Sequence, residues 1–74
     1  MKNENVISVR ESMRLLGKQM KLTRIGLDLS QKDLSEKTGI SRSTLSCYES
    51  GRWLPPRKHL DKIVVILGKK AFGL

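Results

Sequence analysis

The sequence predicts an all-α fold, and three observations support this class. Apolar residues recur with the spacing of an amphipathic helix between residues 8 and 25, and again between residues 60 and 67. Between these stretches, residues 30–50 carry the start and stop signals of two short helices joined by a tight turn. The run 63–67 is rich in β-branched residues and could form a strand. Its i, i+3, i+4, i+7 spacing favours a helix there as well.

The first predicted helix spans residues 8–25 and has one apolar stripe. The residues at helical spacing that we expect in the core are Val9, Met13, Leu16, Met20 and Thr23. Leu15, Leu22 and Ile25 lie off this stripe. They are either scattered surface residues or a contact for a second protein.

The next two helices form a motif at residues 30–51 whose local signals can be read residue by residue. Ser30 is placed to cap the first of them, with Asp33 three positions later completing a short capping box. Gly39 can take the positive φ that ends a helix. Ser41 can then cap the second helix, 42–50.

The helix 42–50 divides into two faces when it is rotated by about 100° per residue. Leu45 and Tyr48 point inward together with Thr44 and Glu49, and an arc of about 140° remains outside. The outward residues are Arg42, Ser43, Ser46, Cys47 and Ser50. Short side chains around a single arginine allow a helix to approach base edges in the major groove of DNA closely. The alternative is an ordinary amphipathic helix with a solvated polar face.

The last predicted helix follows a loop at residues 51–56 and ends at Gly68. Its inward residues are Leu60, Ile63, Val64 and Leu67. Trp53 is expected at the edge of the domain and His59 on a solvated helix face. The apolar residues outside the inward stripe form a candidate dimer interface: Val65, Ile66, Ala71, Phe72 and Leu74.

Composition predicts one small domain at residues 8–74 behind a flexible N-terminus at residues 1–7. The chain has 74 residues and a net charge of +8. One cysteine excludes an internal disulfide and fits a reducing compartment. Because there is neither an apolar run of about 18 residues nor a signal peptide, we expect a cytoplasmic protein with no membrane partner.

The distribution of charge favours a nucleic-acid partner. Glu49 is the only acidic residue between Lys37 and Leu60, whereas Arg42, Arg52, Arg57 and Lys58 lie in the same stretch. Such a basic surface around an outward helix is suited to phosphate contacts, although it could also serve solubility alone. Pro55 and Pro56 exclude a basic membrane-surface helix in residues 52–58.

Residues 16–67 resemble the phage repressor/Cro-like (XRE-type) helix-turn-helix family. The residues that carry the resemblance are Leu16-Gly17, Met20, Arg24, Leu29-Ser30-Gln31, Leu34, Gly39-Ile40-Ser41, Thr44-Leu45-Ser46, Glu49, Gly51, Pro55, Leu60, Ile63 and Leu67. The chain departs from the family at Asp28, where Gly is frequent, and at Ser35, where Ala is frequent. Asp tolerates a left-handed backbone, so the turn at Asp28 can be retained.

The resemblance implies a bundle of four or five helices that binds operator DNA, usually as a dimer. It implies a partly buried ion pair between Arg24 and Glu49. Arg42 is the best candidate for a bidentate contact with guanine. Ser43, Ser46 and Cys47 correspond to the other base-contacting positions. The expected phosphate contacts are Gln31, Ser41, Arg52, Arg57 and Lys58.

Sequence-specific binding of double-stranded DNA by a homodimeric transcriptional regulator, acting as a repressor, is therefore the predicted function. An antitoxin that also neutralises a toxin protein is the alternative, and a binder without sequence preference is a further one. An enzyme is not expected, because His59 has no accompanying catalytic constellation and no phosphate-binding glycine loop occurs. We expect no cofactor, and no spacing typical of a metal site is present.

Overall fold

Ser8 caps the longest helix of the computed structural model, which describes residues 8–72. Its hydroxyl accepts the N–H of Glu11 at 3.1 Å, and the Glu11 carboxylate accepts the N–H of Ser8 at 3.4 Å. The helix, α1 (Val9–Gly26), is followed by a turn in which Asp28 takes a left-handed φ of +63°. The expected flexible segment, residues 1–7, lies outside the described residues.

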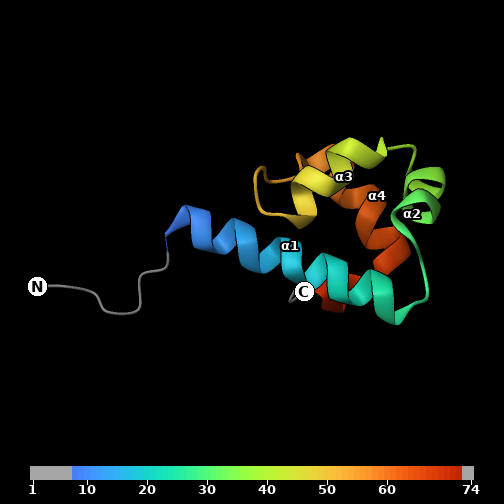
Figure 1. Cartoon of the computed structure of the whole chain (residues 1–74), viewed down its shortest axis with the longest axis horizontal. Coiled ribbons are helices and arrows are strands. Elements are labelled where there is room, and N and C mark those ends of the chain that lie inside the picture. The colour runs from blue at the N-terminus through green and yellow to red at the C-terminus, as the bar shows by residue number, and fades with distance from the viewer. Residues whose placement is uncertain (1–7, 73–74) are drawn as a thin grey trace, which may run out of the picture.

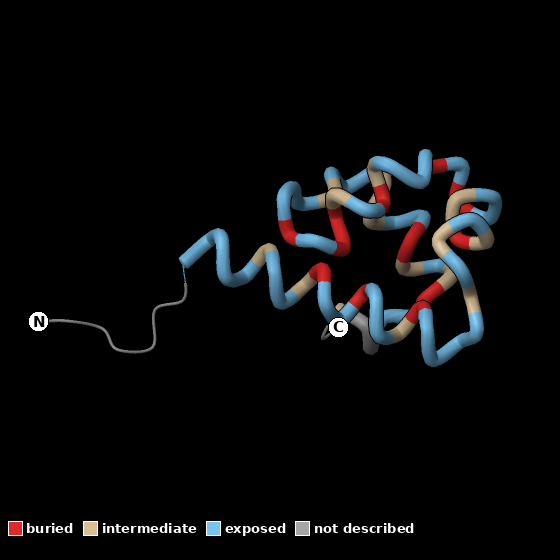
Figure 2. Tube along the Cα trace, viewed as in Figure 1, coloured by how far each residue is buried: buried red, intermediate tan, exposed pale blue. Residues whose placement is uncertain are grey.

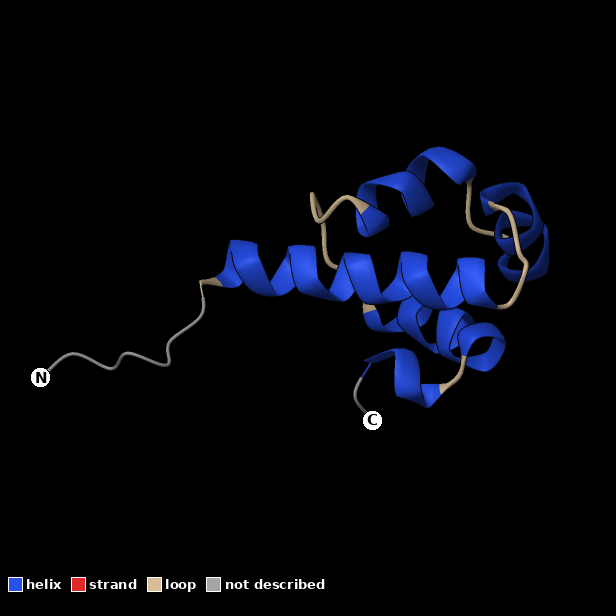
Figure 3. Ribbon diagram, turned by 60° about the horizontal axis from the view of Figure 1, so that its bottom comes forward, coloured by secondary structure: helices blue, strands red, loops and turns tan. Residues whose placement is uncertain are grey.

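Three further α-helices complete the fold, which confirms the predicted all-α class. They are α2 (Gln31–Thr38), α3 (Arg42–Glu49) and α4 (Arg57–Leu67), followed by a short 3-10 helix, η1 (Lys69–Phe72). Helix α1 contacts α3, α4 and η1, while α2 contacts α3 and α4. Helix α3 and the C-terminal segment η1 lie on opposite sides of α1 (Figures 1 and 3).

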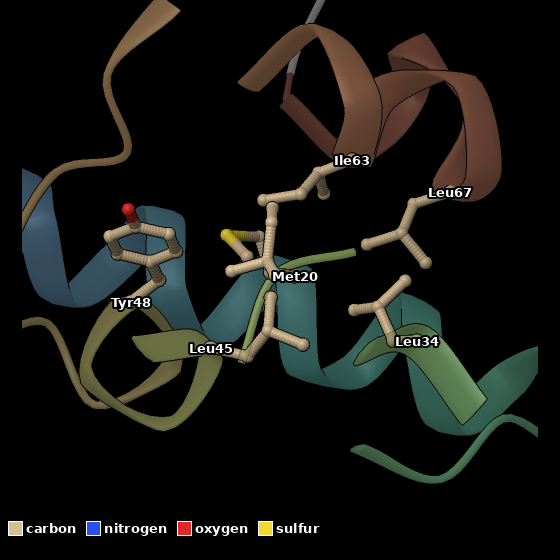
Figure 4. Close-up of a cluster of buried hydrophobic side chains, with 7 residues drawn as sticks. Met20, Leu34, Leu45, Tyr48, Ile63 and Leu67 are labelled. Carbon is tan, nitrogen blue, oxygen red and sulfur yellow. The ribbon is translucent and has the colours of Figure 1, made fainter. Parts of the chain in front are cut away.

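The core lies where α1, α2, α3 and α4 converge. Met20, Leu34, Leu45 and Ile63 come from these four helices in turn and have no exposed surface. Their side chains meet those of Tyr48 and Leu67 at the centre of the bundle (Figure 4). Burial of this kind contributes about 1.5–3 kcal/mol for each large apolar side chain, and it fixes how α3 sits on the other helices.

The N-terminal turns of α1 extend beyond the rest of the bundle, which corrects one expectation for its apolar stripe. Val9 was predicted to lie in the core, but it is 70% exposed. No other helix lies beside these turns, whose trace is mostly exposed (Figure 2). Leu15, Leu22 and Ile25 are each about half exposed, at 53, 54 and 52%.

The candidate dimer residues fall into different environments. Ile66 and Phe72 are partly buried and pack against the core, so much of their apolar surface is already covered within the chain. Val65 is 80% exposed. The Ala71 side chain and Leu74 lie outside what the structure describes. Of this set, Val65 therefore offers the most surface to a second copy, and the interface itself stays a prediction.

Gly17 allows α1 and α3 to approach closely. A Cβ atom at this position would lie 2.6 Å from the carbonyl oxygen of Glu49, which is backbone and cannot move aside freely. Gly17→Ala should therefore lower the free energy of unfolding by about 1–3 kcal/mol.

Urea denaturation measures this effect, with Gly26→Ala as the matched control. Nothing lies within 4 Å of a Cβ added at Gly26. The control should therefore be no less stable than the wild type. Equal stabilities of the two variants would contradict the close approach at Gly17.

Candidate nucleic-acid interface

Side-chain hydrogen bonds hold both ends of α2. The Ser30 hydroxyl accepts the N–H of Asp33 at 2.9 Å, and the Asp33 carboxylate accepts the N–H of Ser30 at 2.9 Å. Gly39 takes a φ of +77° directly after α2, as a left-handed helix end requires. The Thr38 hydroxyl donates to the Leu34 carbonyl at 2.7 Å and accepts the N–H of Ile40 at 3.2 Å, which holds the chain as it leaves the helix.

The capping carboxylate of Asp33 also makes the stability of the fold depend on pH. The backbone N–H of Ser30 is the main cause that lowers the pKa of the Asp33 carboxyl below its ordinary value. Because the folded-state pKa lies below the unfolded one, this cap contributes its full stability above the unfolded pKa. The contribution is lost as the pH falls through the folded-state pKa.

Helix α3 has the two faces that helical periodicity predicts. Leu45, Tyr48 and Glu49 are buried. The outward residues Arg42, Ser43, Ser46 and Ser50 are exposed, and Cys47 is half-buried. The Ser41 hydroxyl caps the helix by accepting the N–H of Thr44 at 3.2 Å and donates to the Thr44 hydroxyl at 2.8 Å. The exposed face therefore starts at Arg42 and carries short side chains after it.

A buried polar network attaches α3 to α1 and α2. The Arg24 Nε donates to Glu49 Oε2 at 2.8 Å, and its Nη2 donates to Oε1 at 3.1 Å. Its Nη1 donates to the Leu29 carbonyl at 2.8 Å, just before α2. Gln31 Nε2 donates to Glu49 Oε1 at 3.1 Å. Every nitrogen of the guanidinium is hydrogen-bonded, so this ion pair helps to fix α3 against α1 and the start of α2.

The Gln31 contact changes what its side chain can offer to DNA. The family resemblance predicts a phosphate contact for Gln31, through either its side chain or its backbone N–H. In the structure the side-chain amide is bonded to Glu49, and Gln31 is the first residue of α2. The Ser30 hydroxyl occupies the N–H of Asp33, whereas the backbone N–H groups of Gln31 and Lys32 have no partner within the helix. The backbone N–H is thus the part of Gln31 best placed for an anion.

The remaining phosphate candidates lie on exposed segments. Arg52 follows α3, while Arg57 and Lys58 begin α4, and all three are exposed. Arg57 Nε lies 3.3 Å from Asp61 Oδ1 in a solvent-exposed pair. Trp53, expected at the domain edge, is 58% exposed in the intervening loop.

His59 does not lie on a solvated face, so that expectation was wrong. Its Nδ1 is 2.7 Å from the Tyr48 hydroxyl, and the side-chain contact is partly buried. Burial raises the pKa of the Tyr48 phenol, so the hydroxyl keeps its proton and is available for a hydrogen bond with Nδ1. This bond joins the inner face of α3 to α4 and gives His59 a structural role.

Lys21 is an exposed cation to which no sequence motif assigns a role. It lines a small hollow with Gln31, Ser46, Glu49 and Ser50, next to the exposed face of α3.

Within residues 8–72, no group of three His, Cys, Asp or Glu residues is placed to hold a metal ion. In the same part of the chain, no helix is both long and apolar enough to cross a bilayer.

Comparisons with known proteins agree with this arrangement. A family model described as helix-turn-helix matches residues 20–74. The chain is 36% identical over 52 residues to the ImmF control region 10 kDa protein of Bacillus phage phi105. The matched stretch covers 70% of this chain and 58% of that relative. The chain belongs to the phage repressor/Cro-like helix-turn-helix family of DNA-binding transcription regulators.

Proposed function

We propose that the chain binds a specific operator in double-stranded DNA through α3 and acts as a transcriptional repressor. The observation that carries this proposal is the exposed face of α3, on which Arg42 projects among the short side chains of Ser43 and Ser46. Arg42 donates to O6 and N7 of a guanine in the major groove. Ser43, Ser46 and Cys47 contact neighbouring bases, with Cys47 lying deepest on that face.

Phosphate contacts position this helix in the groove. In this proposal the phosphate contacts come from the backbone N–H of Gln31 at the start of α2 and from the exposed cations Arg52, Arg57 and Lys58. Ser41, at the N-terminus of α3, adds a contact on the same side. Such contacts fix the register on the duplex without reading its sequence. The phage relative's name, which refers to a control region, supports a regulatory role.

The proposed repressor is a homodimer that reads a two-fold symmetric site. Val65 is the most exposed apolar member of the candidate interface. Two copies related by a two-fold axis would place their recognition helices about 34 Å apart, one helical turn of DNA.

Selection of bound sequences from a random duplex pool tests the proposed function with the full chain. The expected product is a palindrome whose half-sites are about one helical turn apart and contain a guanine. A pool that remains random after repeated selection, although the protein retains DNA, would contradict sequence-specific recognition.

A second candidate function is that of an antitoxin, which the exposed apolar residues of α1 favour. Leu15 and Leu22 are seven residues apart on one side of the helix and more than half exposed. The antitoxin role would be supported if a neighbouring gene encodes a protein that arrests growth and this chain relieves the arrest. Leu15→Ser/Leu22→Ser should then abolish the relief while DNA binding persists. Relief that survives the double substitution would contradict a role of this surface.

A further inference from the structure

Two neighbouring hollows follow the line where α1 crosses α3, and cations of α1 line both. Arg10 and Arg14 line the first hollow together with Arg52 and Ser50. Lys21 lines the second together with Gln31, Ser46 and Ser50. Ser50, directly after α3, belongs to both, so the hollows adjoin one another. We call Arg10, Arg14, Lys21 and Arg52 the basic seam.

The three helical members of the basic seam lie on the flank of α1 that faces α3 and the segment 50–52 after it. At about 100° per residue, Arg10, Arg14 and Lys21 fall within an arc of about 40°. Gly17, which packs against the backbone of α3, lies about 20° from the edge of this arc. From Arg10 to Lys21 the helix rises about 16 Å. The seam is thus an extended row of cations beside α3 and the segment 50–52 that follows it.

The charges of the basic seam are not neutralised within residues 8–72. The salt bridges in this part of the chain join Arg24 to Glu49 and Arg57 to Asp61, and neither includes a seam residue. Glu49 lines the second hollow, but Arg24 and Gln31 occupy its oxygens. The Arg10, Arg14, Lys21 and Arg52 side chains therefore present positive charge to solvent.

We propose that the basic seam binds the sugar-phosphate backbone of DNA, so that α1 is part of the DNA interface. This inference rests on the proposed function, because Ser46 and Gln31 at the second hollow belong to the face that meets the operator. A DNA strand presents one phosphate per about 3.4 Å of helix axis, and a row of about 16 Å can meet several of them. Arg10, Arg14 and Lys21 thereby add contacts that were not expected of the first helix.

The test measures how the observed binding constant depends on salt. Arg10→Gln/Lys21→Gln removes two seam charges and leaves Arg14, which packs against Gly51, in place. The matched single variants are Lys21→Gln and Lys69→Gln, which carry the same substitution. Lys69 is exposed on η1, on the opposite side of α1 from α3 (Figures 1 and 3). Circular dichroism melts establish that each variant is folded.

Fluorescence anisotropy on a selected duplex and a random duplex gives the slope of log Kobs against log salt concentration. Each lost phosphate contact should reduce the magnitude of the slope by about 0.9, and the double variant should lose about twice that. Binding to the selected duplex and binding to the random duplex should weaken by the same factor, because phosphates carry no sequence information. Lys69→Gln should keep a slope within error of the wild type.

A double variant that is folded and keeps the wild-type slope would overturn the inference. An equal loss of slope in Lys21→Gln and Lys69→Gln would do the same, because it would reflect net charge instead of position. A wild type that binds both duplexes alike contradicts the proposed function instead. The slope comparison then still decides the role of the seam, since phosphate contacts are independent of sequence.

Discussion

Replacing Arg24 with alanine is expected to lower the free energy of unfolding by about 3–5 kcal/mol. The substitution leaves the Glu49 carboxylate buried with only the Gln31 amide as its side-chain partner, and it removes the donor to the Leu29 carbonyl. An uncompensated buried charge costs far more than the ion pair contributes on its own. The loss should be large because this network joins three helices.

Thermal and urea denaturation followed by circular dichroism measure this effect. For a domain of this size, the expected loss corresponds to a fall in Tm of more than about 10 °C. Arg57→Ala is the control, since it breaks the solvent-exposed pair with Asp61 and should cost at most about 0.5 kcal/mol. Similar melting curves for the two variants would show that the buried network does not hold α3 in place.

Replacing Arg42 with alanine is expected to weaken binding to the selected operator by about 1–3 kcal/mol, or roughly 5- to 150-fold. Binding to random DNA should change much less, because the lost contact is to a base edge. Arg42 is exposed at the start of α3, so the substitution leaves the core untouched.

Arg52→Ala provides the comparison that separates base contacts from phosphate contacts. It should weaken binding to selected and random duplexes by the same factor. It should also reduce the magnitude of the slope of log Kobs against log salt concentration by about 0.9. Anisotropy titrations of both duplexes at several salt concentrations measure the difference. Equal losses on both duplexes for both variants would contradict the separate roles of Arg42 and Arg52.

The features that could be predicted from the sequence are those decided by nearest neighbours along the chain. The capping of α2 by Ser30 and Asp33 needs residues three apart, and the stop at Gly39 needs a single backbone conformation. The division of α3 into two faces follows from helical periodicity alone. These local signals were sufficient to locate the motif and its exposed face.

Contacts between helices were not predictable in the same way. The bond between Tyr48 and His59, and that between Gln31 and Glu49, join residues 11 and 18 positions apart. Their geometry depends on how α3 lies against α2 and α4, which no local pattern specifies. Lys21 was missed for the same reason, because its place beside Ser46 follows from the close crossing at Gly17.

Periodicity also could not show where a helix gains or loses its neighbours. Val9 continues the apolar stripe of α1 yet is exposed, because the N-terminal turns extend beyond the bundle. Ile66 lies off the predicted stripe of α4, yet it packs against the core together with Phe72 of η1. In both cases the length of the adjacent elements, and not the spacing of apolar residues, determines burial.

The most direct test of base recognition by α3 measures whether the contribution of Arg42 to binding depends on a single atom of the operator, the N7 of a guanine. Each guanine of the selected site is replaced by 7-deazaguanine, which lacks the N7 acceptor, and binding by wild type and Arg42→Ala is compared in a double-mutant cycle. Replacing one particular guanine in each of the two half-sites should weaken binding by the wild type. The same replacement should leave binding by Arg42→Ala unchanged. If every replacement weakens both proteins equally, Arg42 does not read a guanine and the proposed role of α3 is wrong.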